Sequence, residues 1–95
     1  MKIEELENPP QWLLDADTNF ANVEIIDGIV HWNGGVWRDG VWEDGIWHSG
    51  FFEGGTWKNG VWYDGIWENG TWYGGKWEKG YKNKLVKSDT QPFNK

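Results

Sequence analysis

The chain has 95 residues, including 10 Trp and 14 Gly but no Cys, and its formal net charge is −6 at pH 7. This length allows one domain with tails and excludes two domains with separate cores, while the lack of Cys excludes a disulfide framework and thiolate chemistry. The negative charge argues against direct binding to nucleic acid or to an anionic membrane surface, so an electrostatic partner should be basic.

The first residues lack the basic and then apolar pattern of a signal peptide. No run approaches the ~20 apolar residues of a membrane-spanning helix. We therefore expect a protein that does not contact membranes and is located in the cytoplasm, or in the host cytoplasm if its source is viral.

The N-terminal segment, residues 1–29, is acidic, with seven Asp or Glu and one Lys. Two β-rich runs, residues 23–26 and 29–32, flank an Asp27-Gly28 turn signal, which predicts a hairpin that caps the region that follows. Apolar residues further upstream are predicted to form a lid over the same end. These residues are Trp12, Leu13, Leu14 and Phe20.

A repeat dominates residues 30–80, because residues 31–80 divide without a gap into ten pentapeptides. They read HWNGG, VWRDG, VWEDG, IWHSG, FFEGG, TWKNG, VWYDG, IWENG, TWYGG and KWEKG. Gly occupies every fifth position, which disfavours a helix and predicts turns. The second positions are the predicted core: Trp32, Trp37, Trp42, Trp47, Phe52, Trp57, Trp62, Trp67, Trp72 and Trp77.

A longer period is superimposed on the pentapeptides, since the fourth position is Gly only at Gly34, Gly54 and Gly74, twenty residues apart. This spacing predicts an all-β fold, a short four-sided β-solenoid of about two and a half 20-residue coils with an N-terminal hairpin cap. Such a coil would stack Trp37, Trp57 and Trp77. An open antiparallel meander is the alternative topology, but it would repeat every ten residues.

The interior of this coil follows from the alternation of side chains along extended segments. Each Trp shares a side with the Gly two residues before it, so we expect the indole rings to fill the interior and the flanking positions to face water. Each indole N–H then needs an acceptor, predicted to be a carbonyl at a corner.

The pentapeptide period, with a large apolar centre and a small residue two before it, resembles the pentapeptide-repeat proteins. The resemblance covers residues 31–80 and implies a square right-handed β-solenoid. The chain departs from the family pattern, because Trp replaces the usual Leu or Phe, Gly replaces Ala, and Asp or Asn follows the centre instead of preceding it. Proteins of this family include acidic, dimeric inhibitors that imitate DNA and bind topoisomerases, so the resemblance implies a shape and, as an expectation, an inhibitory interaction.

The C-terminal segment, residues 81–95, is basic, with four Lys and one Asp, and it lacks the period. We expect a mobile tail, which either contacts the acidic body or is simply solvated.

The sequence offers little for catalysis or cofactor binding. His31 and His48 are predicted on different faces, and no third His or Cys completes a metal site or a catalytic triad. The glycines recur every five residues and form no strand–loop–helix phosphate site. We therefore expect no enzyme activity, no metal and no cofactor.

Candidate partner-binding residues fall into an acidic and an apolar group. In a 20-residue coil Asp44 and Asp64 stack on one corner, and the acidic group is Glu43, Asp44, Asp64 and Glu68. The apolar group comprises outward β-branched residues and one Tyr: Val41, Ile46, Val61, Ile66 and Tyr63.

These features predict a non-enzymatic interaction protein, a rigid acidic solenoid that binds a macromolecular protein partner with a basic surface. Inhibition of that partner, as by a phage-type or accessory factor, is the expected consequence. Two alternatives stay open. One is a small-ligand binder that stacks a nucleotide or sugar on Trp rings, and the other is a structural or assembly component of a particle, in which the chain forms a homo-oligomer.

Overall fold

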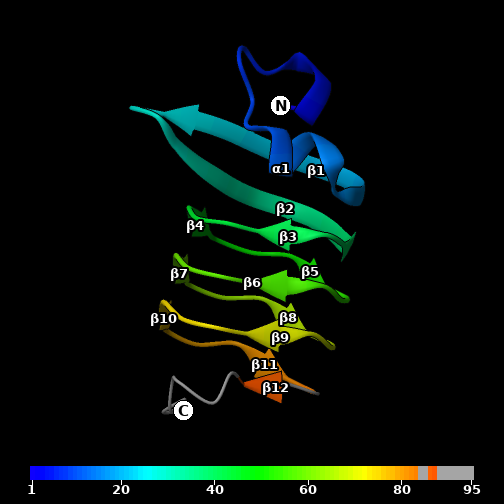
Figure 1. Ribbon diagram of the computed structural model, residues 1–95, viewed down its shortest axis with the longest axis vertical. Helices are drawn as coiled ribbons and strands as arrows, with labels where there is room; N and C mark the ends of the chain where they lie inside the picture. Colours follow the sequence, from blue (N-terminus) through cyan, green and yellow to red (C-terminus); the bar gives the residue numbers. More distant parts are fainter. Residues whose placement is uncertain (84–85, 88–95) are drawn as a thin grey trace.

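The computed structural model of the protein describes residues 1–83 and 86–87. These residues form a β-solenoid of about 3 turns beneath an N-terminal cap (Figure 1). The cap begins with two short helices, η1 (Ile3–Glu5) and α1 (Gln11–Asp15). The predicted all-β solenoid with an N-terminal hairpin cap is confirmed.

The hairpin of the cap consists of β1 (Asp17–Ile26) and β2 (Ile29–Asp39), which pair antiparallel. Asp27 and Gly28 form its two-residue turn with φ of 53° and 78°. Positive φ at both positions matches the twist of the two strands. The predicted hairpin is therefore present, and its strands are longer than the two runs from which it was predicted.

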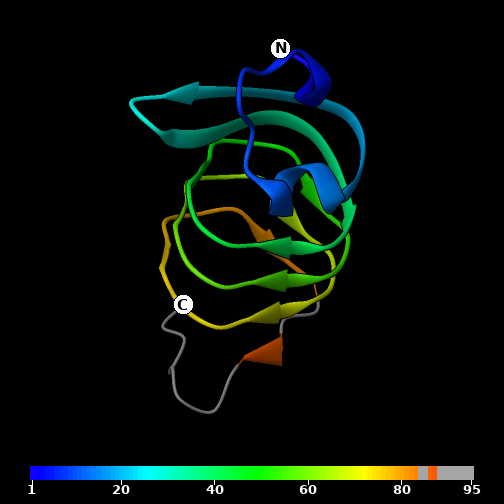
Figure 2. The ribbon, with the colours of Figure 1, turned by 45° about the horizontal axis from the view of Figure 1, so that its top comes forward.

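Below the hairpin, each pentapeptide contributes one two-residue strand, and the strands pair in parallel. These strands are β3 (Val41–Trp42), β4 (Ile46–Trp47), β5 (Phe51–Phe52), β6 (Thr56–Trp57), β7 (Val61–Trp62), β8 (Ile66–Trp67), β9 (Thr71–Trp72), β10 (Lys76–Trp77), β11 (Tyr81–Lys82) and β12 (Val86–Lys87). Figure 2 shows the coils wound one below another beneath the hairpin. The parallel pairing excludes the antiparallel meander.

The coil contains 15 residues and has three sides, so the predicted four-sided coil of 20 residues was wrong. Trp32 pairs with Trp47, which pairs with Trp62, and Trp37 pairs with Phe52. The first side consists of β2, β4, β7 and β10, the second of β2, β5, β8 and β11, and the third of β3, β6, β9 and β12. Residues twenty apart, such as Trp37 and Trp57, therefore lie on different sides.

Two kinds of Gly explain why the period was misread. A Cβ at Gly34 would meet no atom within 4 Å, and none of the fourth-position glycines has a positive φ, so their 20-residue spacing carries no information about the coil. The fifth-position glycines form the corners. Gly55 has a φ of 108°, and a Cβ there would overlap the carbonyl oxygen of Gly40, one coil earlier.

Aromatic rings fill the triangular interior. Within a layer, neighbouring rings meet edge to face, as Trp37 and Trp42 do with centroids 5.7 Å apart and planes at 74°. Between layers they stack almost parallel, as Trp42 and Trp57 do at 5.0 Å and 6°. The repeat rings from Trp32 to Trp72 are buried, and Trp77 is half-buried, which agrees with the predicted aromatic core.

Six indole N–H groups of the repeat do not reach a corner carbonyl, contrary to the prediction. In the described part of the chain, these six are buried without an acceptor: Trp32, Trp37, Trp42, Trp47, Trp57 and Trp62. The corner carbonyls instead accept backbone N–H groups of the next coil, as Gly40 does from Thr56 at 2.9 Å. Ring stacking fixes the orientation of the indole planes, and the corner carbonyls are already hydrogen-bonded to backbone N–H groups of the next coil.

The solenoid continues past residue 80, where the sequence predicted that the repeat ends. Tyr81 pairs with Ile66, and Val86 pairs with Thr71. Of the predicted mobile tail, residues 84–85 and 88–95 lie outside the described residues.

Candidate partner-binding groove

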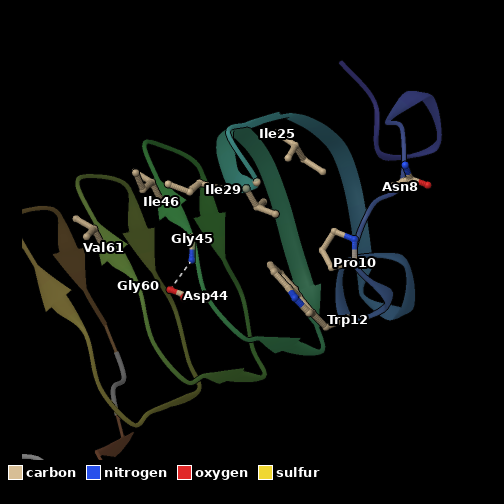
Figure 3. Close-up of a pocket in the computed structure, with 12 residues that line it drawn as sticks. Asn8, Pro10, Trp12, Ile25, Ile29, Asp44, Gly45, Ile46, Gly60 and Val61 are labelled. Atoms are coloured by element: carbon tan, nitrogen blue, oxygen red, sulfur yellow. Dashed lines mark hydrogen bonds between the residues drawn. The ribbon is translucent and has the colours of Figure 1, made fainter.

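A groove of about 480 Å³ separates the cap from one corner of the first coils (Figure 3). Its apolar lining comes from the cap, the hairpin and the first side of the solenoid: Pro10, Trp12, Ile25, Ile29, Val30, Ile46 and Val61. Asn8 and Asp44 are its two polar side chains. The groove can hold one or two large apolar side chains, with a carboxylate at its edge.

The cap wall of the groove is built by α1. Pro10 is the N-cap of this helix, and its φ of −66° and extended ψ are the backbone conformation usual at that position. Trp12 is half-buried and packs on Trp42 with the ring centroids 5.1 Å apart and on Trp37 at 6.4 Å. Leu13 is fully buried behind it. Trp12 and Leu13 therefore form the predicted lid.

The other two residues of the predicted lid point into solvent. Leu14 is 48% exposed and Phe20 is 84% exposed. Leu14 follows the buried Leu13 on a helix of five residues, so only part of that short helix can face the core. Phe20 lies where the pairing of β1 with β2 is irregular. Their assignment to the lid was wrong.

The opposite wall is a corner of the solenoid that two consecutive coils share. Ile46 and Val61 are partners in the parallel ladder, so their side chains lie one below the other. Gly45 and Gly60 turn the chain just before them, with φ of 133° and 121°. Asp44 is exposed, and its Oδ1 accepts the N–H of the next residue, Gly45, at 2.9 Å, the hydrogen bond drawn in Figure 3.

The predicted acidic corner does not assemble, because residues twenty apart lie on different corners. Glu43 pairs with Lys58 at 3.7 Å, and Asp64 lies 4.0 Å from Lys79. Glu68 accepts a hydrogen bond from the Asn83 side chain at 3.2 Å. Of the four predicted acids, only Asp44 lines the groove, and it has no ion-pair partner among the described residues.

The predicted apolar patch is also divided. Ile46 and Val61 line the groove, whereas Val41 lies on the third side and Ile66 on the second. Tyr63 lies on the first side, where its ring is nearly parallel to that of His48 at 5.5 Å.

The two histidines, predicted on different faces, are in contact. His31 Nδ1 and His48 Nε2 are 3.0 Å apart, and the ring planes differ by 11°. The ring centroids are 5.2 Å apart, which is close to the N···N distance of 3.0 Å plus the centroid-to-nitrogen distance in each ring. The two nitrogens therefore point at each other, and the rings meet edge to edge in an N–H···N hydrogen bond. A 15-residue coil brings together residues 17 apart, which a 20-residue coil would separate.

The surroundings of this pair lower the pKa of His48 below its usual value. Partial burial is the main cause and the nearby His31 is the second, while Glu24 opposes both. Glu24 also accepts a hydrogen bond from the Asn33 side chain at 3.0 Å. Within the described chain no three His, Cys, Asp or Glu side chains lie close enough to hold a metal ion.

Several groove residues were not among the predicted partner-binding residues, notably Asn8, Pro10, Ile25 and Ile29. The concentration of acids in residues 1–29 was the one sequence signal for this region. Only the fold shows that the groove lies between the hairpin tip and α1 on one side and the corner at residues 44–46 on the other.

Among the described residues, no helix is both long and apolar enough to cross a membrane. No protein-family model matches the sequence, and neither curated proteins nor solved structures gave a significant match.

Proposed function

We propose that this chain is a non-enzymatic interaction protein whose groove takes an apolar segment of a partner protein that also carries basic residues. The observation that carries the proposal is an apolar groove with one carboxylate, Asp44, in its lining and with the acidic N-terminal segment forming one of its walls. The cap contributes seven acids against one Lys, and Asp44 adds a carboxylate from the opposite wall.

The size of the groove favours a short segment as its occupant. Its volume of about 480 Å³ lies in the range of sites that hold a small ligand or a few side chains. Burial of apolar side chains would supply the affinity, and the surrounding charge would steer a basic partner and raise its association rate.

The rigid frame supports binding without rearrangement. Trp12, which forms part of the groove, packs on two core rings, and the opposite wall is tied into the ladder between coils. A preformed site loses little conformational entropy when it binds. The alternative of stacking a nucleotide or sugar on Trp loses its basis for the rings from Trp32 to Trp72, whose faces are buried against one another.

The relation to the pentapeptide-repeat proteins belongs to the same proposal. We propose a likeness of period and shape, with three pentapeptides in each coil instead of the four of a square coil. Inhibition of the partner follows if the bound segment belongs to the partner's working surface, as for a phage-type or accessory factor acting in the cytoplasm.

The test is selection of random linear peptides on the immobilised full chain, followed by affinity measurements on variants. We expect enriched peptides to combine large apolar residues with Lys or Arg. Asp44→Asn keeps a side-chain oxygen for the Gly45 N–H and should weaken binding by about 2- to 5-fold at low salt. Asp64→Asn is the matched control, because Asp64 accepts the same hydrogen bond from the following Gly N–H at a corner outside the groove.

A second pair of variants tests the apolar wall. Ile29 is 45% exposed in the groove, and Ile29→Ser should weaken binding by about 10-fold through lost apolar burial. Phe51 is 39% exposed on the second side, so Phe51→Ser should leave affinity unchanged. Peptides that lack basic residues, or that bind both members of each pair equally, would overturn the proposal.

A further inference from the structure

The chain contains two histidines, and the fold places their rings in contact. His31 lies on β2 of the hairpin, and His48 directly follows β4 of the first coil below it. Their side chains face outward on the first side of the solenoid, since each is next to a buried Trp of its own strand. Both residues are half-buried, so a small solute can reach the rings.

The separation of the two facing nitrogens matches the one that a shared metal ion requires. His31 Nδ1 and His48 Nε2 are 3.0 Å apart. Two imidazole nitrogens that ligate one ion at about 2.0–2.1 Å are about 2.9 Å apart at a right angle and about 3.3 Å apart at a tetrahedral angle. The observed distance lies between these two values.

The N–H···N hydrogen bond shows that the pair offers a free electron pair. One of the two facing nitrogens has to accept the bond, so its ring is neutral. With the other ring neutral as well, the shared proton can move through water to the second nitrogen of its own ring, which leaves a lone pair on both facing nitrogens. Rotation about the side-chain bonds of the half-buried residues then turns both lone pairs towards one point beside the line that joins the nitrogens.

Neighbouring residues hold the two rings and add a negative charge. Tyr63 lies one coil below His48, and the two rings are nearly parallel with centroids 5.5 Å apart. Glu24 is the ladder partner of His31, and its charge acts on His48 as well. The Asn33 side chain donates a hydrogen bond to this carboxylate. A carboxylate beside metal-bound imidazoles favours the bound cation.

The donor atoms indicate the class of ion. Neutral imidazole suits Zn²⁺, Ni²⁺ and Cu²⁺, whereas Mg²⁺ and Ca²⁺ prefer oxygen ligands. Among the described residues, no third His, Cys, Asp or Glu side chain is close enough to complete the site, so water occupies the remaining positions around the ion. Two protein ligands make a weaker and more open site than the four of a closed structural zinc site.

We propose that His31 and His48 form a surface site for a divalent transition-metal ion, with Zn²⁺ and Cu²⁺ as the ions of the right chemistry. The ion joins β2 of the cap hairpin to the coil below it. Neither histidine lines the groove, so the inference does not rest on the proposed function and either can fail without the other.

The first arm of the test is calorimetric titration of the full chain with Zn²⁺, with Mg²⁺ as the control ion. His31→Gln and His48→Gln should each weaken Zn²⁺ binding by about 10-fold or more. Glu24→Gln should weaken it by about 2- to 5-fold, and Glu53→Gln, an exposed acid on the second side, should leave it unchanged. Unchanged Zn²⁺ affinity in both histidine variants would overturn the proposal.

The second arm identifies the ligands in the unaltered chain, so it does not depend on how a variant folds. Pulsed electron paramagnetic resonance of the chain with less than one equivalent of Cu²⁺ should show coupling to two imidazoles. Coupling to one imidazole, or to none, would exclude the two-histidine site.

The third arm tests whether the ion joins the cap hairpin to the coil. Unfolding separates the two histidines, so an ion bound by both stabilises the folded chain. With Zn²⁺ at about ten times its Kd, the midpoint of thermal unfolding should rise by about 5–10 °C. An equal rise in His48→Gln would contradict this role.

The groove and the metal site are tested separately. Peptides selected on the groove should bind His48→Gln as tightly as the unaltered chain, because neither histidine lines the groove. Loss of Zn²⁺ binding with intact peptide binding is therefore the expected result for this variant. Loss of both would contradict the separation of the two sites.

Discussion

The fifth-position glycines impose the strictest requirement on a single residue. Gly55 has a φ of 108°, and its Cα lies against the backbone of Gly40 one coil earlier. A side chain there meets backbone atoms that are themselves held by the ladder between coils. Neither the corner nor its neighbour can move aside.

Alanine substitutions separate the two classes of Gly. Gly55→Ala should lower the free energy of unfolding by about 1–3 kcal/mol or more, from positive φ and overlap with Gly40. Gly34→Ala has open space around its Cβ and should change it by no more than about 1 kcal/mol. Urea unfolding followed by Trp emission gives both values, and equal losses would contradict this assignment of corners.

The histidine pair makes stability depend on pH in a definite direction. The pKa of His48 in the folded chain lies below the ordinary value of 6.5, so between these two values the unfolded chain binds more protons. Stability should therefore be complete above pH 6.5 and fall as the pH drops through this window. His31 contributes through its Coulombic effect, which lowers the pKa of His48 after the larger effect of burial.

The measurement is the urea midpoint across that pH range, compared with His48→Gln. The variant should lose most of the pH dependence that the unaltered chain shows in the window. The same slope in both proteins would contradict the assignment of this pH dependence to His48.

At the scale of elements, α1 shows how a helix of five residues can seal a solenoid. Its Leu13 is fully buried, whereas Leu14 is 48% exposed, although the two are adjacent and chemically identical. Only one face of so short a helix can meet the first layer of rings.

This contrast gives a matched pair of substitutions in the cap. Leu13→Ala should cost about 2–5 kcal/mol of stability through the cavity that it leaves, and Leu14→Ala about 0.5 kcal/mol or less. Thermal and urea unfolding measure the difference. Similar small losses would show that the cap can be removed without exposing the core.

The elements differ in how far the sequence predicts them. The Asp27-Gly28 hairpin and the aromatic interior follow from local rules of turn chemistry and alternation, and both are present. The number of sides was not predictable from the fourth-position Gly, because none of those residues has the positive φ of a corner. It depends on how many indoles fill one layer.

The groove was the least predictable feature, since it requires the register between coils. The sequence predicted that Ile46 and Val61 face outward. It did not predict that they are neighbours, because their pairing depends on the 15-residue coil. Pro10 and Ile29 line the groove because the cap folds over the first coil. The cap has no repeated sequence pattern from which this arrangement could be predicted.

At the scale of the whole molecule, the solenoid is a stack of equivalent layers. Each coil contacts mainly the coils before and after it, so stability should be nearly a sum of layer and interface terms. The molecule should therefore tolerate deletion of a complete layer better than a deletion that breaks the pentapeptide frame.

Deletion of residues 66–80 joins Gly65 to Tyr81, and the second side then continues in its own register. We expect a cooperative unfolding transition with a smaller dependence on urea, in proportion to the buried surface removed. Deletion of residues 66–78 breaks the pentapeptide frame and should abolish cooperative unfolding. Equal behaviour of the two deletions would contradict the layered description.

Two of the three columns of stacked rings consist of indoles alone, and they have an optical consequence. Rings such as Trp32, Trp47 and Trp62 are nearly parallel at 4.8 and 4.9 Å, so their transition dipoles are coupled. Excitation energy absorbed by one ring should be transferred along its column before fluorescence is emitted. Rapid loss of emission anisotropy and a strong exciton couplet in circular dichroism would then report the winding directly, without an added chromophore.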